Sequence, residues 1–319
     1  SEARRVDRTK GSFAVDREAL PVETDLHGPL LVADATSTIV VPEGWSARAD
    51  EFGGLMLDRR GSEPTGITGA ASSEIMACRL ESIAREMGET LRRTALSVNV
   101  KERLDYSCGI VDAAGRLVVN APHMPVHLGA MGDCVRAVTS RLDLGPGDVA
   151  LVNHPGFGGS HLPDLTVVSP VFAGSGDCIG HVVNRAHHAE IGGTRPGSMP
   201  PDATRLVEEG VVIPPMKIVT AGVPAFEVFE EMLRRAPHPS RAVADNLADL
   251  AAQLASNELG VRRLATLWRE VGPTDFDRDL EGLRRRCGAA IGRLIDARPG
   301  FDRSVEERLD DGTPIRLRV

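Results

Sequence analysis

A glycine- and proline-rich stretch at residues 61–70 constrains the fold most, because it separates two parts of the chain with different patterns. Its ten residues, GSEPTGITGA, include three glycines and one proline, a composition typical of a linker. Before it, short apolar runs at 28–33, 37–41 and 55–57 alternate with glycine and proline turns, so residues 1–60 are predicted to form a small β module. Strands this short do not make a stable domain alone.

Beyond the linker, which we extend to residue 72, the pattern changes to long helices and a few strands. Apolar residues repeat with helical spacing after Ser73, which is a suitable N-cap. The predicted helices lie at 73–95, 129–142, 224–235, 240–271 and 276–298, and the predicted strands at 106–111, 116–119, 148–152, 165–172 and 178–184. The sequence therefore predicts a mixed α/β (α+β) protein, in which residues 73–319 form a mixed-sheet core and a helical C-terminal part.

Two features mark the end of the chain. Pro273 is expected to end the helix predicted at 240–271, because proline cannot continue a helix interior. Residues 314–319 alternate apolar and basic side chains, as a half-buried strand does. A strand in this place needs a partner, so we expect the chain to be a piece of a longer polypeptide.

Composition excludes several classes of partner. The formal net charge is −8 and no dense basic run occurs, which argues against nucleic acid and anionic membranes. No stretch is long and apolar enough for a membrane span, and no signal peptide opens the sequence, so a cytoplasmic location is expected. The five cysteines are scattered and form no C-x-x-C pair, which argues against a disulfide framework or a cysteine-rich zinc module.

Histidines concentrate in the middle of the chain. Nine are present, and seven of them fall between positions 123 and 188. Histidine is the commonest metal ligand and the usual acid or base near neutral pH. This concentration therefore predicts a functional site in that region.

The segment GGSHLPD at 158–164 is the first candidate for metal binding. His161 and Asp164 lie three residues apart, and Pro163 between them excludes a helix. Imidazole and carboxylate on one turn make a chelate that suits zinc, manganese or iron. The alternative is structural: His161 caps a turn and Asp164 closes an Asx-turn.

The segment NRAHHAEIGG at 184–193 is the second candidate. His187 and His188 follow an apolar strand, where neighbouring side chains face opposite ways. One of them is therefore expected to ligate the metal while the other acts as acid or base, or supports the ligand. The alternative is a packed surface pair beside a glycine turn.

Two further segments hold polar side chains in unusual settings. His123 and His127 lie among prolines, which favours an extended, rigid loop, although capping of the helix predicted at 129–142 is an equal alternative. Charged residues before the strand at 106–111 either bind a substrate carboxylate or form structural ion pairs; they are Glu102, Arg103 and Asp105.

Two side chains of the chain could act as nucleophiles. Cys108 and Ser198 are both candidates, the latter in a glycine- and proline-rich loop at 195–202. Neither lies in a nucleophile-elbow or papain-like signature. Nor does the chain contain a phosphate-binding loop or a dinucleotide fingerprint.

These segments, in order along the chain, carry a family resemblance. The motifs ERLDYSC, PHMPVHLG, GGSHLPD, NRAHHAE and PGSMPP between residues 102 and 201 closely resemble the B subunit of the hydantoinase/5-oxoprolinase family. The likeness runs from about residue 73 to the end. Residues 1–60 resemble the C-terminal tail of the A subunit, which is fused to B in some members. The resemblance implies an ATP-binding A-type subunit or fused region as partner, and hence a hetero-oligomer.

The resemblance also implies a metal site. Carboxylase members of the family hold a divalent ion on a His-x-x-Asp turn plus a later histidine. Those positions here are His161, Asp164 and His187 or His188. One departure is His154, which stands where the family usually has aspartate, and it puts activity on lactams or hydantoins in question.

The function implied is the B-type portion of an ATP-dependent cyclic-amide hydrolase, with ATP and Mg²⁺ bound only by the A-type part. The divalent metal at the histidine cluster would be Mn, Zn or Fe. The expected acid/base residues are His123, His127 and His188, and the expected substrate-binding residues are Glu102, Arg103, Asp105 and Ser198. The alternatives are a carboxylase-type subunit acting on a ketone, and a non-catalytic assembly subunit.

Overall fold

The computed structural model divides the chain into two compact units, Ser1–Ile67 and Thr68–Val319. It describes residues 5–6, 13–17, 20, 22, 24–33, 37–50, 54–59, 70–120, 124–174, 176–298 and 303–318. Helix α1 begins at Ala70, so the last residues assigned above to the linker are helical, and residues 61–69 lie outside the described part.

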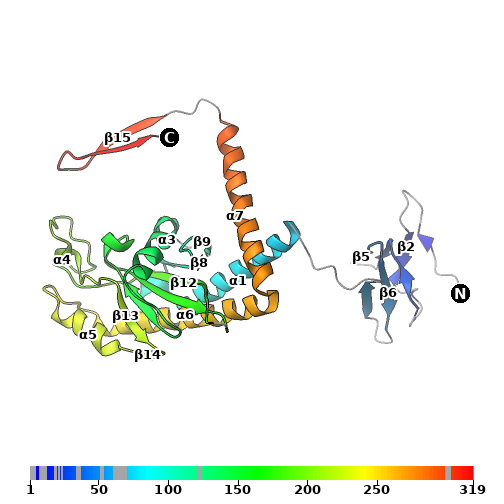
Figure 1. Cartoon of the computed structure of the whole chain (residues 1–319), viewed down its shortest axis with the longest axis horizontal. Helices are drawn as coiled ribbons and strands as arrows, with labels where there is room; N and C mark the ends of the chain where they lie inside the picture. The colour runs from blue at the N-terminus through cyan, green and yellow to red at the C-terminus, as the bar shows by residue number, and fades with distance from the viewer. Residues whose placement is uncertain are drawn as a thin grey trace. The chain divides into compact units, whose positions relative to one another are not determined.

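The N-terminal unit contains two small sheets (Figure 1). Its strands agree with the small β module predicted for residues 1–60, although the division into two sheets was not predicted. One sheet has the order β1 (Arg5–Val6), β2 (Phe13–Asp16), β4 (Leu30–Ala33), β5 (Thr38–Val41), and the other β3 (Leu26–His27), β6 (Trp45–Ala49), β7 (Leu55–Arg59). Leu30, Val32, Val41 and Ala47 form its buried core. Strand β6 was not predicted, because WSARA contains no apolar run and buries only small side chains.

The larger unit is built on a seven-stranded sheet. Its order is β14 (Val223–Pro224), β13 (Met216–Thr220), β10 (Val149–Val152), β11 (Asp164–Phe172), β12 (Cys178–His187), β8 (Tyr106–Asp112), β9 (Leu117–Asn120). The mixed α/β class is confirmed, but the sheet itself is not mixed: every neighbouring pair is antiparallel. Hairpin turns join β8 to β9, β11 to β12 and β13 to β14, and the other neighbouring strands meet through longer connections.

Helices cover both faces of this sheet (Figure 1). Val168 and Val183 pack against α3 (Pro125–Thr139), whereas their neighbour Val182 packs with α1 (Ala70–Thr94) and α6 (Val243–Val271). Adjacent residues of a strand face opposite ways, so α3 lies on one face and α1 and α6 lie on the other. The remaining helices are α2 (Val98–Lys101), α4 (Leu206–Glu209), α5 (Phe226–Arg235), α7 (Pro273–Asp296) and the 3₁₀ helix η2 (Pro155–Phe157).

Two prolines that were expected to lie outside helices are the first residues of helices. Helix α3 starts at Pro125, four residues earlier than expected, and α7 starts at Pro273. Proline is favoured at the first helical position, since its missing N–H has no partner there anyway. Helix α6 ends just before, at Val271, and its C-cap is Gly272, whose φ is 84°. No helix in the described part of the chain is long and apolar enough to cross a membrane.

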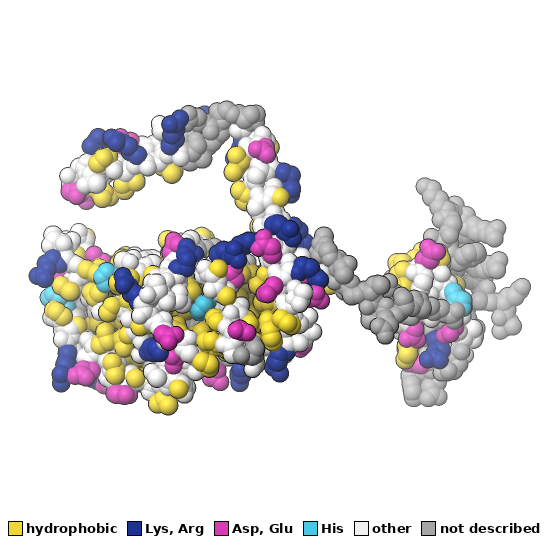
Figure 2. Space-filling view, in the orientation of Figure 1, with side chains coloured by type: hydrophobic (Ala, Val, Ile, Leu, Met, Phe, Trp, Pro, Cys, Tyr) yellow, Lys and Arg dark blue, Asp and Glu magenta, His cyan; other side chains and the backbone are white. Residues whose placement is uncertain are grey.

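The C-terminal strand has a partner but no burial. Strand β16 (Pro314–Arg318) pairs with β15 (Ser304–Arg308), and every residue of both strands is exposed. The strand expected at 314–319 is therefore confirmed over Pro314–Arg318, but the expectation that it is half-buried is wrong; Val319 lies outside the described residues. Apolar side chains of this hairpin and of the C-terminal half of α7 lie open to solvent (Figure 2), as Ile295 does with 66% exposure.

Candidate metal centre

Antiparallel pairing brings two of the histidine motifs together at one end of two central strands of the sheet. Strands β11 and β12 are joined by a tight turn near Gly176, and Asp164 at the start of one is the register partner of His187 at the end of the other. Ligand atoms of His161, Asp164 and His187 all lie within 4.8 Å of one another. The imidazole rings of His161 and His187 stack with their centroids 5.3 Å apart.

This donor set fits a divalent transition metal. Two imidazole nitrogens and one carboxylate oxygen suit zinc, manganese or iron, and donors around one such ion lie about 3–4 Å apart. The observed limit of 4.8 Å needs only a small contraction. Three protein ligands leave coordination positions for water or substrate, as catalytic sites do.

The local sequence explains why His161 and Asp164 reach the same place. Gly158 has a φ of 81°, and a Cβ there would lie 2.6 Å from the backbone of Cys134 in α3. A Cβ at Gly159 would lie 2.2 Å from the carbonyl oxygen of Asn153. Only glycine fits at either position, so the chain can turn tightly against α3 and β10 before it enters β11.

Asp164 is the electrostatic centre of the cluster. One carboxylate oxygen lies 2.9 Å from Nδ1 of His187 and the other lies 3.7 Å from Nε2 of His127. Burial alone would raise the pKa of Asp164, but the contacts with His127 and His187 outweigh it and hold the pKa well below its usual range. Asp164 is therefore a carboxylate at neutral pH, as a metal ligand must be.

The two other members of the cluster respond in opposite ways. Burial favours a lower pKa for His187, but the hydrogen bond to Asp164 reverses the balance and raises the pKa. Burial lowers the pKa of His161, which keeps that imidazole neutral and able to ligate. Asp105 also faces the cluster, since one of its carboxylate oxygens lies 3.8 Å from Nδ1 of His187.

His127 lies beside the cluster on the first turn of α3. Its side chain is buried, and its Nδ1 lies 3.1 Å from the hydroxyl of Ser107 in β8. The same hydroxyl accepts a hydrogen bond from the backbone N–H of Met124, which holds the start of α3 against the sheet. No sequence signal marks Ser107, because a serine in a strand is common. His123, the other histidine of this motif, lies outside the described residues.

His188 lies on the opposite face of the sheet from the cluster. It is fully buried under α6, where Nε2 contacts Gln253 at 3.0 Å and Nδ1 contacts Asn246 at 3.1 Å. Burial lowers the pKa of His188. Both ring nitrogens are thus engaged in holding α6 to the sheet, and only His187 of the pair faces Asp164.

The predicted substrate-binding residues are divided between two settings. Glu102 and Arg103 are exposed on the turn before β8, and the charge of Arg103 is near enough to oppose the raised pKa of His187. Ser198 is fully buried; its hydroxyl accepts from the N–H of Ile191 and donates to the carbonyl of Gly192. Its hydroxyl therefore fixes the loop that backs His161.

His154, at the position where the family usually has aspartate, acts as a local cap. Its Nδ1 accepts a hydrogen bond from the backbone N–H of Gly156 at 2.9 Å and so caps η2. Aspartate forms the same kind of cap.

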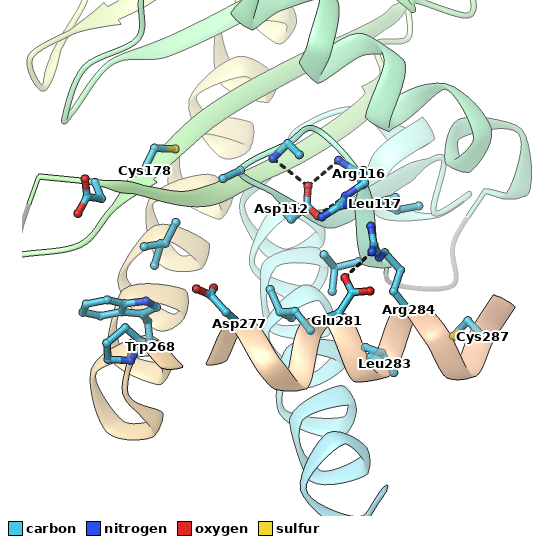
Figure 3. A pocket seen from close by; sticks show the side chains of 17 residues that line it. Asp112, Arg116, Leu117, Cys178, Trp268, Asp277, Glu281, Leu283, Arg284 and Cys287 are labelled. Carbon is cyan, nitrogen blue, oxygen red and sulfur yellow. Dashed lines mark hydrogen bonds and ion pairs between the residues drawn. The ribbon is translucent and has the colours of Figure 1, made fainter. Parts of the chain in front are cut away.

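A cavity lies in another part of the larger unit, away from this cluster. It measures about 630 Å³ and is lined by the β8–β9 hairpin, the start of β12 and helices α6 and α7 (Figure 3). Trp268 and Asp277 line it together with the ion pairs Asp112–Arg116 and Glu281–Arg284. None of His161, Asp164 and His187 lines this cavity.

Comparison with known proteins identifies a family model and several relatives that match this chain. The model of the hydantoinase B/oxoprolinase family matches residues 70–319. The 5-oxoprolinase of Saccharomyces cerevisiae is 36% identical over 94% of this chain and 25% of its own length. The caprolactamase subunit beta of Pseudomonas jessenii is 31% identical over 60% of this chain and 33% of its own length.

A solved structure agrees with these sequence matches. The crystal structure of the ATP-dependent caprolactamase from Pseudomonas jessenii superposes with a TM-score of 0.69 and 25% identity, over 79% of this chain and 45% of that chain. The present chain spans about a quarter of the length of the first curated relatives that it matches.

Proposed function

This chain belongs to the hydantoinase B/oxoprolinase family, and from that premise we propose that it is the B-type portion of an ATP-dependent enzyme that hydrolyses cyclic amides. The observation that carries the proposal is the cluster of His161, Asp164 and His187, whose ligand atoms lie within 4.8 Å of one another. The relatives add the reaction class, since they include a 5-oxoprolinase and an ATP-dependent caprolactamase.

The three clustered residues would hold a divalent metal. A metal bound there would polarise a carbonyl oxygen or lower the pKa of a bound water. The carboxylate of Asp164 supplies the negative charge of the site, and the neutral imidazole of His161 supplies a nitrogen donor.

Within the site, His127 is the acid/base residue that we favour. Its Nδ1 contacts the hydroxyl of Ser107 at 3.1 Å, while its Nε2 points toward Asp164 at 3.7 Å, beyond hydrogen-bond length, so this nitrogen would exchange a proton on the cluster side. His188 fits this role poorly, because both of its ring nitrogens contact side chains of α6. His123 remains a prediction from the sequence.

Two charged groups at the cluster edge would hold the polar ends of the substrate. Asp105 lies beside His187, and the exposed Arg103 is close to the same ring. A carboxylate or a ring N–H of a cyclic amide could pair with them. Ser198 would contribute through its backbone and the loop that it fixes.

ATP would be bound by an A-type subunit or fused region, which would phosphorylate the amide oxygen and make the ring carbon electrophilic. Water would then attack that carbon, His127 would take up the proton, and the ring nitrogen would receive a proton as the C–N bond breaks. The acyl phosphate of the opened ring that results would be hydrolysed by a second water to the carboxylate and inorganic phosphate. Residues 1–60 would be the tail of the A-type region, in keeping with their resemblance to it.

The test is to co-produce the chain with the rest of its parent polypeptide, including the A-type ATPase. Purified enzyme is then incubated with ATP and either 5-oxoproline, caprolactam or a hydantoin. We expect ring opening coupled to ATP hydrolysis without bicarbonate, and its loss in Asp164→Asn. Turnover that requires bicarbonate and a ketone, or a protein that retains activity after Asp164→Asn, would refute the proposal.

A further inference from the structure

We propose that Arg185 is a positioning residue of the candidate metal centre, because its guanidinium holds the turn at residues 158–160 in the place from which His161 reaches the cluster. This inference rests on the proposed metal-binding role of the cluster. Arg185 is fully buried in β12, two residues before His187 and on the same face of the sheet.

The guanidinium makes three hydrogen bonds, and two of them go to the turn. Nη2 donates to the carbonyl oxygen of Gly158 at 2.6 Å and Nη1 donates to the hydroxyl of Ser160 at 2.6 Å. Nε donates to the hydroxyl of Thr166 at 2.8 Å, and Thr166 is the register partner of Arg185 in β11. The planar fork therefore links β12, β11 and the turn rigidly.

All three acceptors are neutral, which makes the arginine costly. Within the described residues, no carboxylate forms an ion pair with Arg185, although its side chain is fully buried. Burying a charge without a counterion is unfavourable, and an apolar side chain of similar volume would avoid that cost. What the arginine adds is a pair of fixed donors directed at the turn.

The turn depends on this tether because its own backbone bonds are long. The N–H of Gly158 contacts the carbonyl of Pro155 at 3.2 Å, and the N–H of Gly159 contacts that of His154 at 3.4 Å. The contacts from Arg185 are shorter, at 2.6 Å each, and charge-assisted. They are the stronger restraint on the turn.

The effect of Arg185 falls on one ligand in particular. Asp164 and His187 are held in place by the ladder between β11 and β12. His161 lies outside that ladder and directly follows Ser160, and its carbonyl accepts a hydrogen bond from the N–H of Asp164 at 2.9 Å. Its position therefore depends on the turn on one side and on β11 on the other. Loosening the turn should therefore displace one of three ligands and leave the other two in register.

The experiment measures metal binding and local dynamics in the same variants. Mn²⁺ or Co²⁺ affinity is measured by titration calorimetry, and the Co²⁺ absorption spectrum reports the coordination geometry. Amide hydrogen exchange of residues 156–162 is measured without metal. The variants are Arg185→Met, Arg185→Lys and the milder Ser160→Ala, which keeps the test valid if the arginine variants fail to fold.

We expect Arg185→Met and Arg185→Lys to bind metal about 10–100-fold more weakly, as supporting residues of metal ligands typically do when replaced. Ser160→Ala should give a smaller loss with an altered Co²⁺ spectrum, and Ser160→Thr, which keeps the hydroxyl, should restore both. All variants except Ser160→Thr should show faster exchange at 156–162.

Arg136 provides the matched control, since it also binds a turn through a backbone carbonyl. Its Nη1 donates to Gly115 at 2.5 Å in the β8–β9 hairpin, away from the cluster. Arg136→Met should speed exchange near residue 115 and leave metal affinity unchanged.

The outcomes separate this inference from the proposed function. A wild-type chain that binds no metal would refute the metal site itself, and a turn that also exchanged no faster in Ser160→Ala would refute the tether. Faster exchange with unchanged metal affinity and spectrum would refute the positioning role alone, since the turn would then be only structural. Weaker metal binding in Arg185→Met equal to that in Arg136→Met would refute it as well.

Discussion

Replacing Asn153 should uncouple three segments that meet behind the candidate site. Its side chain is fully buried at the end of β10, and its amide nitrogen donates to the carbonyls of Leu162 and Val211, both at 2.8 Å. Its amide oxygen accepts from the N–H of Ile213 at 2.7 Å. At about 1 kcal/mol for each hydrogen bond, Asn153→Ala should lower the free energy of unfolding by about 3 kcal/mol.

The assay is urea unfolding of the purified chain, followed by circular dichroism, with Asn99→Ala as control. The side chain of Asn99 makes no hydrogen bond within the described residues, so its replacement should change the unfolding free energy by less than about 0.5 kcal/mol. A loss below about 1 kcal/mol for Asn153→Ala would refute the reasoning, because the three partners would then have found other acceptors and donors.

Asn153→Asp refines the same test through its pH dependence. The carboxylate can still accept from Ile213, but its second oxygen would face two carbonyl oxygens in a buried place. The folded state should therefore raise the pKa of this carboxyl, and stability should rise as the pH falls and the group takes up a proton. Stability that is insensitive to pH between about 7 and 4 would contradict this account.

Three other measurements test the electrostatics of the fold. Burial lowers the pKa of His181, so stability should fall as the pH drops below about 6.5 toward the folded pKa, and His181→Leu should reduce that slope in urea unfolding at several pH values. Burial raises the pKa of Cys108 to about 12, so iodoacetamide at pH 8 should modify the exposed Cys78 but spare Cys108 until urea is added, as read by mass spectrometry. The Lys217 ammonium lowers the pKa of the largely buried Asp148 from 3.8 to about 2, so this carboxylate contributes stability at neutral pH that is lost as the pH falls from about 4 to 2. Asp148→Asn should cost about 2 kcal/mol at pH 7 and flatten acid unfolding in that range, whereas an unchanged acid profile would exclude this contribution.

Part of the site could be predicted because the sheet obeys local rules. The short segment between the strands predicted at 165–172 and 178–184 favours a hairpin, and a hairpin places the start of one strand beside the end of the other. The choice between His187 and His188 could not be made, because a shift of one residue exchanges the two faces. The answer depends on where the strand ends. Because β12 continues to His187 with its side chains alternating between the two faces, the ring of His187 lies on the same face as Asp164.

The position of His127 could not be predicted because proline has two opposite meanings. Pro122 and Pro125 were interpreted as signs of an extended loop, yet Pro125 is the first residue of α3. Proline is unfavourable inside a helix and favourable at its start, and nothing in the neighbouring residues distinguishes the two cases. The contact of Ser107 with both Met124 and His127 decides it in the folded state.

The burial of the polar face of α6 could not be predicted from the sequence pattern. Asn246, Gln253 and Asn257 recur at helical spacing, which in an amphipathic helix marks the solvent side. Here they are buried against the sheet, where Gln253 and Asn257 donate to the backbone carbonyls of Leu165 and Val167. A polar stripe can pack inside only if each amide finds partners, and those partners lie about 60–90 residues away in sequence.

The same network explains why His188 is buried on the other side of the sheet from the candidate ligands. Its ring joins Asn246 and Gln253 and so helps fix α6 to the end of β12, the strand that carries His187. One histidine of the pair thus anchors the covering helix on one face, while the other meets Asp164 on the opposite face. The two adjacent histidines therefore have separate roles, because neighbouring residues of a buried strand face opposite sides of the sheet.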